Sequence, residues 1–209
     1  MADSIFWNYL EDLPEQEAAW KEWQSGLTGW HRFNTFYTHY LRVEGRRVKL
    51  LNCTELCEHD CPRRIIEDSP SSITAVCPLD GAVPIQLKFR DILIYSLRHE
   101  ALHRALCTSL NIRYLADRRK KYVHIWHLGD YSGTEVYLTY ETSTLTDTIS
   151  LLYLSQQAPF ILMAPTRKNI TPEMQQFIDK NKFILLSIAD ELTLQTDGSF
   201  KSVRNIPQI

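Results

Sequence analysis

A helix between two uninterrupted apolar runs constrains the fold of this chain more than any other feature. Residues 160–163 read Phe-Ile-Leu-Met, and residues 183–188 form a second apolar run. Between them, Thr171 stands where it can cap a helix whose first position is Pro172. Strands without polar alternation are typically buried on both faces, as in a parallel sheet. The sequence therefore predicts a parallel βαβ unit over residues 160–188.

Shorter elements are predicted around this unit. Alternating apolar and polar residues favour hairpin strands over 122–128 and 135–140. A long helix is predicted over about 90–110. We expect an α+β fold: a small cysteine-clipped β module with the long helix, followed by a C-terminal α/β half with a mixed sheet. The predicted segments are an N-terminal acidic helix and aromatic arm (1–50), a four-cysteine β module with the long helix (51–110) and the α/β half (111–209).

Charge and hydropathy exclude several classes of protein. Lys and Arg together number 23 against 25 Asp and Glu, which gives a formal charge of -2 and no overall attraction to nucleic acid or anionic membranes. No apolar run approaches the roughly 18 residues of a membrane-spanning helix. The acidic N-terminus lacks the basic region of a secretory signal. We therefore expect a cytoplasmic protein that does not enter membranes.

Four of the five cysteines, namely Cys53, Cys57, Cys61 and Cys77, lie within 25 residues. The odd total, in a chain without an export signal, indicates reduced thiols. The first three are spaced four residues apart, so they would share one face of a helix. Clustered thiolates in a reducing compartment are typical of metal sites, and Zn²⁺ closes a tetrahedral shell of four sulfurs. The sequence predicts a structural zinc site, because four protein ligands leave no open position for a substrate.

The three-plus-one spacing differs from the paired cysteines of zinc ribbons, which leaves other interpretations open. His59 or Asp60 could replace one of the cysteines as a ligand. An iron–sulfur cluster could stand in place of zinc. Buried cysteines also pack as small hydrophobic residues without any metal.

A second constellation reads His-Glu-Ala-Leu-His over residues 99–103. On a helix, His99 and His103 point the same way and can share one Zn²⁺, with Glu100 activating the bound water. The pattern resembles the zincin metallopeptidase signature over these five residues, and it implies a zinc hydrolase as the alternative function. The glycine-turn extension is missing, and polar residues on a partly buried helix give the same pattern. Candidate third ligands are His124, His127, Asp130 and Glu135.

Basic side chains gather at two places. A basic connector consists of Arg113, Arg118, Arg119, Lys120 and Lys121. Arg167 and Lys168 lie between an apolar run and a helix N-terminus, where an anion is favoured. The connector could contact the phosphates of a nucleic acid. A solvated linker and a plain strand–helix connection are the ordinary interpretations of these two segments.

The leading hypothesis is a non-enzymatic, metal-clipped interaction or regulatory protein. A four-cysteine site without a complete catalytic set motivates it, and an aromatic content of 11% favours a macromolecular partner, either protein or nucleic acid. The alternative is the peptidase-like zinc hydrolase that uses Glu100. The sequence identifies neither the partner nor the oligomeric state.

Overall fold

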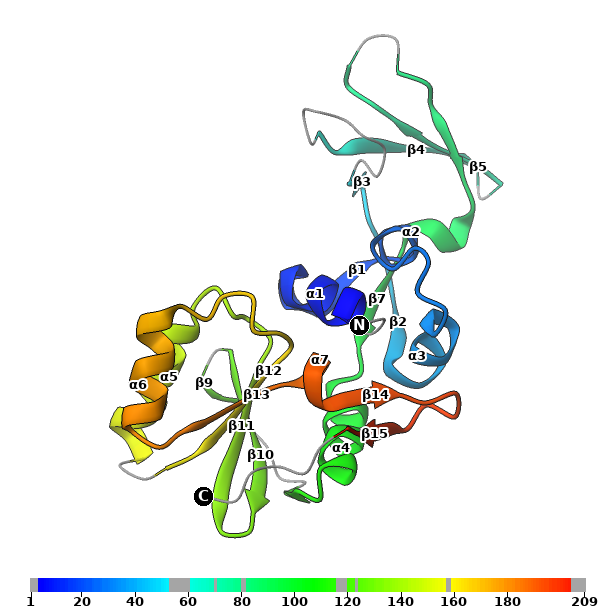
Figure 1. Cartoon of the computed structure of the whole chain (residues 1–209). Coiled ribbons are helices and arrows are strands. Elements are labelled where there is room, and N and C mark those ends of the chain that lie inside the picture. Colours follow the sequence, from blue (N-terminus) through cyan, green and yellow to red (C-terminus); the bar gives the residue numbers. More distant parts are fainter. Residues whose placement is uncertain are drawn as a thin grey trace. The chain divides into compact units, whose positions relative to one another are not determined.

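The computed structural model describes residues 4–52, 61–69, 71–79, 82–115, 120–122, 124–156 and 159–203 (Figure 1). The chain forms two compact units. Unit 2 consists of Leu13–Arg98, and unit 1 combines Met1–Asp12 with His99–Ile209. Unit 2 is thus inserted between the first helix and the rest of unit 1, a division that differs from the segments 1–50, 51–110 and 111–209 expected from the sequence.

A mixed six-stranded sheet forms the centre of unit 1, in the order β13-β12-β11-β10-β8, with β9 also paired to β10. Strands β10 and β11 form an antiparallel hairpin, and β11, β12 and β13 run parallel. The predicted hairpin, the βαβ unit and the α+β class are therefore confirmed. The strand bounds are β8 Arg113–Tyr114, β9 Lys120–Tyr122, β10 Ile125–Tyr131, β11 Thr134–Thr139, β12 Ile161–Ala164 and β13 Ile184–Ser187.

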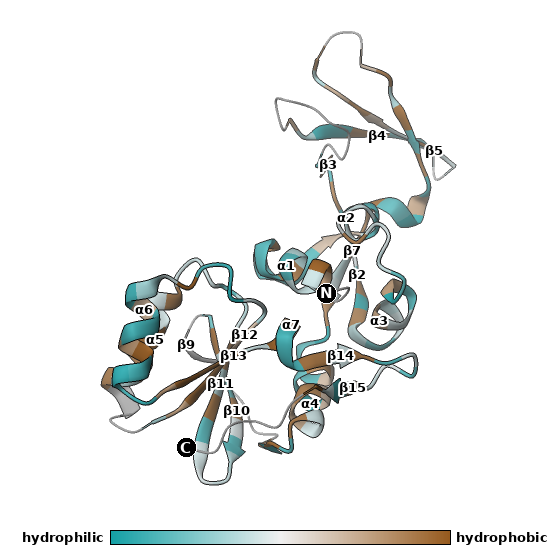
Figure 2. Cartoon of the chain, in the orientation of Figure 1, coloured by the Kyte–Doolittle hydropathy of each residue, from teal (hydrophilic) through white to brown (hydrophobic). Residues whose placement is uncertain are grey.

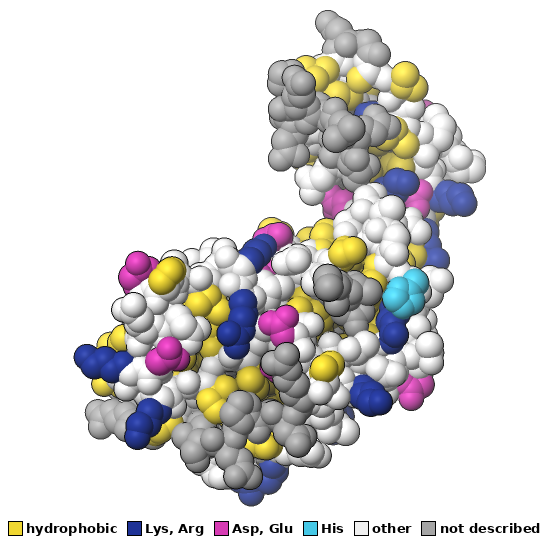
Figure 3. All heavy atoms as spheres, viewed as in Figure 1, with side chains coloured by type: hydrophobic (Ala, Val, Ile, Leu, Met, Phe, Trp, Pro, Cys, Tyr) yellow, Lys and Arg dark blue, Asp and Glu magenta, His cyan; other side chains and the backbone are white. Residues whose placement is uncertain are grey.

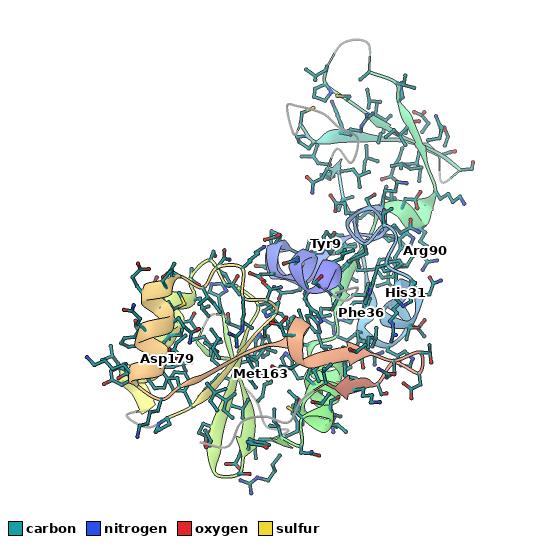
Figure 4. The ribbon with its side chains drawn as sticks, in the orientation of Figure 1. Tyr9, His31, Phe36, Arg90, Met163 and Asp179 are labelled. Carbon is teal, nitrogen blue, oxygen red and sulfur yellow. The ribbon has the colours of Figure 1, made fainter. Side chains whose placement is uncertain are left out.

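Two helices cover one face of this sheet, α5 (Leu145–Gln156) and α6 (Pro172–Lys180). The Thr171 side chain accepts a hydrogen bond from the Met174 amide at 3.2 Å, which is the predicted cap of α6. Apolar side chains from both helices and from alternate strand positions form a common core, in which Ile149, Ile178 and Leu162 are buried. Strands β12 and β13 are accordingly hydrophobic along nearly all of their length (Figure 2), and Met163 of β12 lies within the sheet (Figure 4).

The opposite face of the sheet presents Trp126, Leu138 and Tyr140, because side chains alternate along β10 and β11. Helix α4 (His99–Ser109) brings His103 against Trp126 and Tyr140 there. No helix in the described part of the chain has the length and apolar character of a bilayer-spanning segment.

The predicted helix over 90–110 is wrong in its first half. Phe89–Ile92 is a short 3₁₀ turn (η2), and β7 follows at Leu93–Leu97; only α4 is α-helical. A short apolar run such as Leu93–Leu97 fits a buried strand and a buried helix equally well by periodicity. Strand β7 is the centre of a three-stranded sheet, so cross-strand pairing decides its conformation.

Unit 2 contains two small antiparallel sheets. The first has the order β1-β7-β2 and the second β3-β4-β5-β6. The Ile73, Leu87 and Ile92 side chains belong to a core shared with Ala19 and Leu51. The remaining bounds are η1 Pro14–Gln16, β1 Glu17–Ala19, α2 Trp20–Gly26, α3 Phe33–Tyr40, β2 Leu41–Arg47, β3 Leu50–Leu51, β4 Arg63–Ser69, β5 Ser72–Val76 and β6 Ile85–Leu87.

The aromatic arm expected near the N-terminus packs as a cluster of rings in unit 2. Phe36 of α3 is buried at its centre, with the ring of Trp30 at 5.8 Å and that of Tyr40 at 5.4 Å (Figure 4). Trp23 donates its indole hydrogen to the Tyr95 carbonyl at 3.0 Å, which ties α2 to β7. The aromatic residues of this segment thus serve the core of unit 2.

The first helix, α1 (Ser4–Asp12), packs within unit 1 against segments that lie far along the chain. It contacts α7 (Ile188–Glu191), and Trp7 is fully buried with its ring 6.0 Å from that of Phe200. Phe200 lies in the hairpin of β14 (Leu192–Leu194) and β15 (Phe200–Ser202), which the sequence also indicates. At the end of α1, the Thr166 hydroxyl donates to Glu11 at 2.6 Å.

Glu11 makes the stability of unit 1 depend on pH. Its side chain is only 2% exposed, and burial raises the pKa of its carboxyl above the ordinary 4.5, against the opposing effects of Thr166 and Lys168. A carboxyl whose pKa is raised in the folded state stabilises the fold at low pH, and this stabilisation is lost as the pH rises through the folded pKa. We therefore expect the wild-type free energy of unfolding to fall relative to that of Glu11→Gln as the pH rises from 4.5.

Urea unfolding at a series of pH values measures this difference. Glu173→Gln serves as the control, because hydrogen bonds from its own backbone amide and from Thr171 lower the pKa of the exposed Glu173 carboxyl and reverse the sign of the effect. Parallel curves for wild type and Glu11→Gln would contradict the prediction.

Candidate metal centre

Two of the predicted metal ligands meet at the open end of the β4–β5 hairpin. Arg64 pairs with Val76, so Cys61, just before β4, and Cys77, just after β5, lie at the same edge of the sheet. Their sulfurs are 3.6 Å apart. A disulfide would require about 2.05 Å. Two thiolates on one tetrahedral zinc, each about 2.3 Å from the metal, stand roughly 3.8 Å apart.

A third strand ends at this edge. Leu51 of β3 pairs with Arg63 in antiparallel register. The end of β3 therefore lies beside the start of β4. Cys53 and Cys57, and the substitute ligands His59 and Asp60, lie outside the described residues. Among the described residues, no three His, Cys, Asp or Glu side chains gather closely enough to hold a metal ion.

A buried arginine organises the loop that follows Cys77. Arg63 is almost inaccessible to solvent, and its Nη1 donates to the Val83 carbonyl at 2.9 Å. A buried guanidinium is tolerated where its N–H groups find acceptors. This bond ties the turn after β5 to β4 and so holds the two sulfurs at the same end of the hairpin.

The two histidines of the His-Glu-x-x-His pattern form an aromatic cluster on the second face of the unit 1 sheet. His103 is buried, and its Nε2 lies 3.0 Å from the Tyr140 hydroxyl. The His99 ring stacks on Trp126 at 4.9 Å with an interplanar angle of 24°. The hydroxyl contact occupies one of the two ring nitrogens through which a histidine binds zinc. Sequence reasoning missed Trp126 and Tyr140, which come from β10 and from the residue after β11.

Burial keeps Tyr140 a neutral phenol. Removal from water raises the pKa of its hydroxyl well above the ordinary 10.0, and the nearby Cys107 adds to the shift. The hydroxyl is therefore protonated at neutral pH and can donate to an unprotonated His103 nitrogen. The pair supplies a buried hydrogen bond between α4 and the sheet.

The other residues of the zincin-like pattern have different partners. Glu100 is exposed, and its carboxylate accepts a hydrogen bond from Arg104 at 2.8 Å, one helical turn away. Each candidate third ligand is in an ion pair. The pairs are His124 with Glu141 at 2.8 Å, His127 with Glu135, and Asp130 with Arg113 at 3.7 Å.

The cations predicted to attract an anion before α6 are paired with carboxylates of the chain itself. Lys168 lies 2.5 Å from Asp12 and 3.9 Å from Glu11. Arg167 donates to the Leu185 carbonyl at 3.0 Å and lies 3.9 Å from Asp190. The acids of α1 are more than 150 residues away in sequence, so no local pattern could reveal the Lys168 pairs.

The basic connector is only partly described. Arg113 is the member with a defined ion pair, to Asp130, and Lys120 and Lys121 belong to β9. Arg118 and Arg119 lie outside the described residues. On the face shown in Figure 3, basic and acidic side chains are interspersed. The structure thus brings Cys61 and Cys77 together, and His99 with His103. The cysteine pair belongs to unit 2, whereas the connector and Arg167 and Lys168 belong to unit 1.

Removal of the Tyr140 hydroxyl tests the histidine cluster. We expect Tyr140→Phe to lower the free energy of unfolding by about 1–3 kcal/mol, because the buried His103 nitrogen loses its partner. Urea denaturation measures the change. Tyr37→Phe, which removes a hydroxyl from a half-buried ring of α3 outside this cluster, should remain within about 0.5 kcal/mol of wild type. Equal stability of both variants would show that the Tyr140 bond contributes nothing.

Comparison with protein families, curated proteins and solved structures finds no match for this chain.

Proposed function

We propose that this chain is a non-enzymatic interaction or regulatory protein whose unit 2 is fastened by one structural zinc ion. The 3.6 Å separation of the Cys61 and Cys77 sulfurs carries the proposal, because it fits the edge of a zinc–sulfur tetrahedron. Cys53 and Cys57, which follow β3 in the sequence, would complete the shell. The ion would stay bound in the cytoplasm, where the thiols remain reduced.

The size of the sheet in unit 2 supports a structural role for the ion. Strand β3 has two residues and β6 three, and side chains such as Leu50, Ile66 and Val83 remain exposed. A small sheet with a thin core gains much of its stability from a crosslink or a metal. Four protein ligands would fill the coordination shell, so the ion would bind no substrate.

The surface of unit 2 is better suited to bind a protein than a nucleic acid. The exposed arginines of β2 are paired with carboxylates. The pairs are Arg42 with Glu44 at 2.7 Å, Arg46 with Glu17 at 2.6 Å, and Arg47 with Glu67 at 2.6 Å. Exposed apolar side chains accompany them, including Val43 and Phe89. Apolar side chains among neutralised charges suit a protein surface better than a phosphate backbone.

The geometry of α4 adds no support to the zinc-hydrolase alternative. Glu100 is held by Arg104 on an exposed side of the helix, and His103 is bonded to Tyr140. A hydrolase of this kind needs a third ligand and a carboxylate beside the metal-bound water.

Metal analysis of the purified, reduced protein tests the zinc proposal. We expect one zinc per chain, lost with Cys77→Ser together with a lowered melting temperature, and retained in Cys107→Ser and His99→Ala. Cys107 is the matched control because it is a buried thiol on α4. Metal-free wild-type protein would refute the proposal. Iron in place of zinc would identify a cluster, and a second zinc lost with His99→Ala would favour the hydrolase.

If the protein binds nucleic acid, we expect the basic connector to contact its phosphates. Replacing Arg118, Arg119, Lys120 and Lys121 with alanine should then weaken binding and flatten its salt dependence, since fewer counterions are released. Fluorescence anisotropy with a labelled duplex and a labelled single strand, at several salt concentrations, measures both quantities. Identical affinity and slope in the variant would exclude the connector as a nucleic-acid site.

A further inference from the structure

Helix α5 carries leucines on its outer side as well as on the side that faces the core. Leu145, Ile149 and Leu152 point into the core of unit 1 and are buried. On the outer side, Leu154 is 72% exposed and Leu151 47% exposed. The helix carries one charged residue along its length, Asp147. Large apolar side chains that gather on the exposed side of a helix mark a surface that a partner can cover.

The apolar surface continues onto α6. The Tyr153 ring meets that of Phe177 edge to face at 5.8 Å, and both remain substantially exposed, at 40% and 37%. Helices α5 and α6 lie side by side over the same face of the sheet (Figure 1). We call the set Leu151, Tyr153, Leu154 and Phe177 the α5–α6 patch.

The first turn of each helix carries an acidic residue, and the last turn of α6 carries a lysine. Each helix connects two parallel strands, so α5 and α6 run in the same direction. Asp147 and Glu173 stand in their first turns, and Lys180 stands in the last turn of α6. Glu173, Phe177 and Lys180 are spaced four and three residues apart and so share one stripe of α6. Asp179 at the same end is on another stripe, where Gln175 donates to it at 2.8 Å (Figure 4).

We propose that the α5–α6 patch is the interface of a symmetric homodimer, in which α5 packs antiparallel to α5 of a second copy. A two-fold axis sets Leu151 and Leu154 against the same residues of the other chain. It also places the acidic helix starts of one copy against Lys180 of the other. A parallel arrangement would bring like charges together. A second copy therefore matches the patch both in apolar character and in charge.

The mass of the full-length, reduced protein in solution tests the proposal. Analytical ultracentrifugation should give twice 24.4 kDa, and Leu154→Glu should raise the dimer dissociation constant at least ~10-fold, since it buries an unpaired charge at the interface centre. Val203→Glu is the matched control, because Val203 is an apolar residue of unit 1, 61% exposed and outside the patch. Circular dichroism checks that both variants fold.

Charge reversal tests the orientation of the helices. Asp147→Lys or Lys180→Asp alone should weaken the dimer by about two- to fivefold, as expected for an exposed ion pair, and the double variant should recover the wild-type constant. A monomer at about 100 μM wild-type protein would overturn the proposal, since even weak interfaces associate there. A dimer that is insensitive to Leu154→Glu, or a double variant weaker than both single ones, would also overturn it. None of these measurements depends on the cysteine site.

Discussion

The burial of α1 in unit 1 is the contact on which the organisation of the whole chain depends. Trp7 and Leu10 are inaccessible to solvent, and Glu11 is held by Thr166 while Asp12 is held by Lys168. These contacts join the first dozen residues to a loop more than 150 residues later. Because the chain leaves unit 1 after Asp12 and returns at His99, unit 2 is an insertion, although its sequence precedes most of unit 1.

The two faces of the mixed sheet in unit 1 pack against different elements. Tyr137 and Leu162 point towards α5 and α6 and build an apolar core. Trp126 and Tyr140, one residue out of phase, meet the histidines of α4. The two histidines of the His-Glu-x-x-His pattern therefore lie in a cluster of rings, where His99 stacks on Trp126 and His103 forms a hydrogen bond with Tyr140. A motif defined by spacing along one helix carries no information about the strands that cover it.

Elements that depend on local signals could be predicted from the sequence. The apolar run 160–163 and the Thr171–Pro172 start of α6 identified the βαβ unit, since strand burial and helix capping are written in adjacent residues. Leu93–Leu97 was misread because pairing with β1 and β2 determines its conformation. The partners of Lys168 could not be predicted either, since ion pairs across 150 residues leave no local trace.

The cysteine site was partly accessible to the same reasoning. The clustering of the cysteines indicated a shared site, and the register of β4 and β5 brings the Cys61 and Cys77 sulfurs to 3.6 Å. The buried Arg63 that secures the neighbouring turn gave no sequence signal, because arginine is usually a surface residue. The structure thus places two of the four predicted cysteine ligands side by side. The two histidines of the His-Glu-x-x-His pattern instead pack against Trp126 and Tyr140.

The insertion of unit 2 also bears on how the chain is made. Helix α1 is synthesised well before Thr166, Lys168 and Phe200, which its docking site needs. At about 5–20 residues per second, the Phe6 and Trp7 side chains wait some ten seconds or more for their binding surface. Early folding of unit 2 would shorten the effective loop that α1 must close and so reduce its entropic cost. Helix α1 therefore remains undocked, and open to proteases and chaperones, until these later segments have been synthesised.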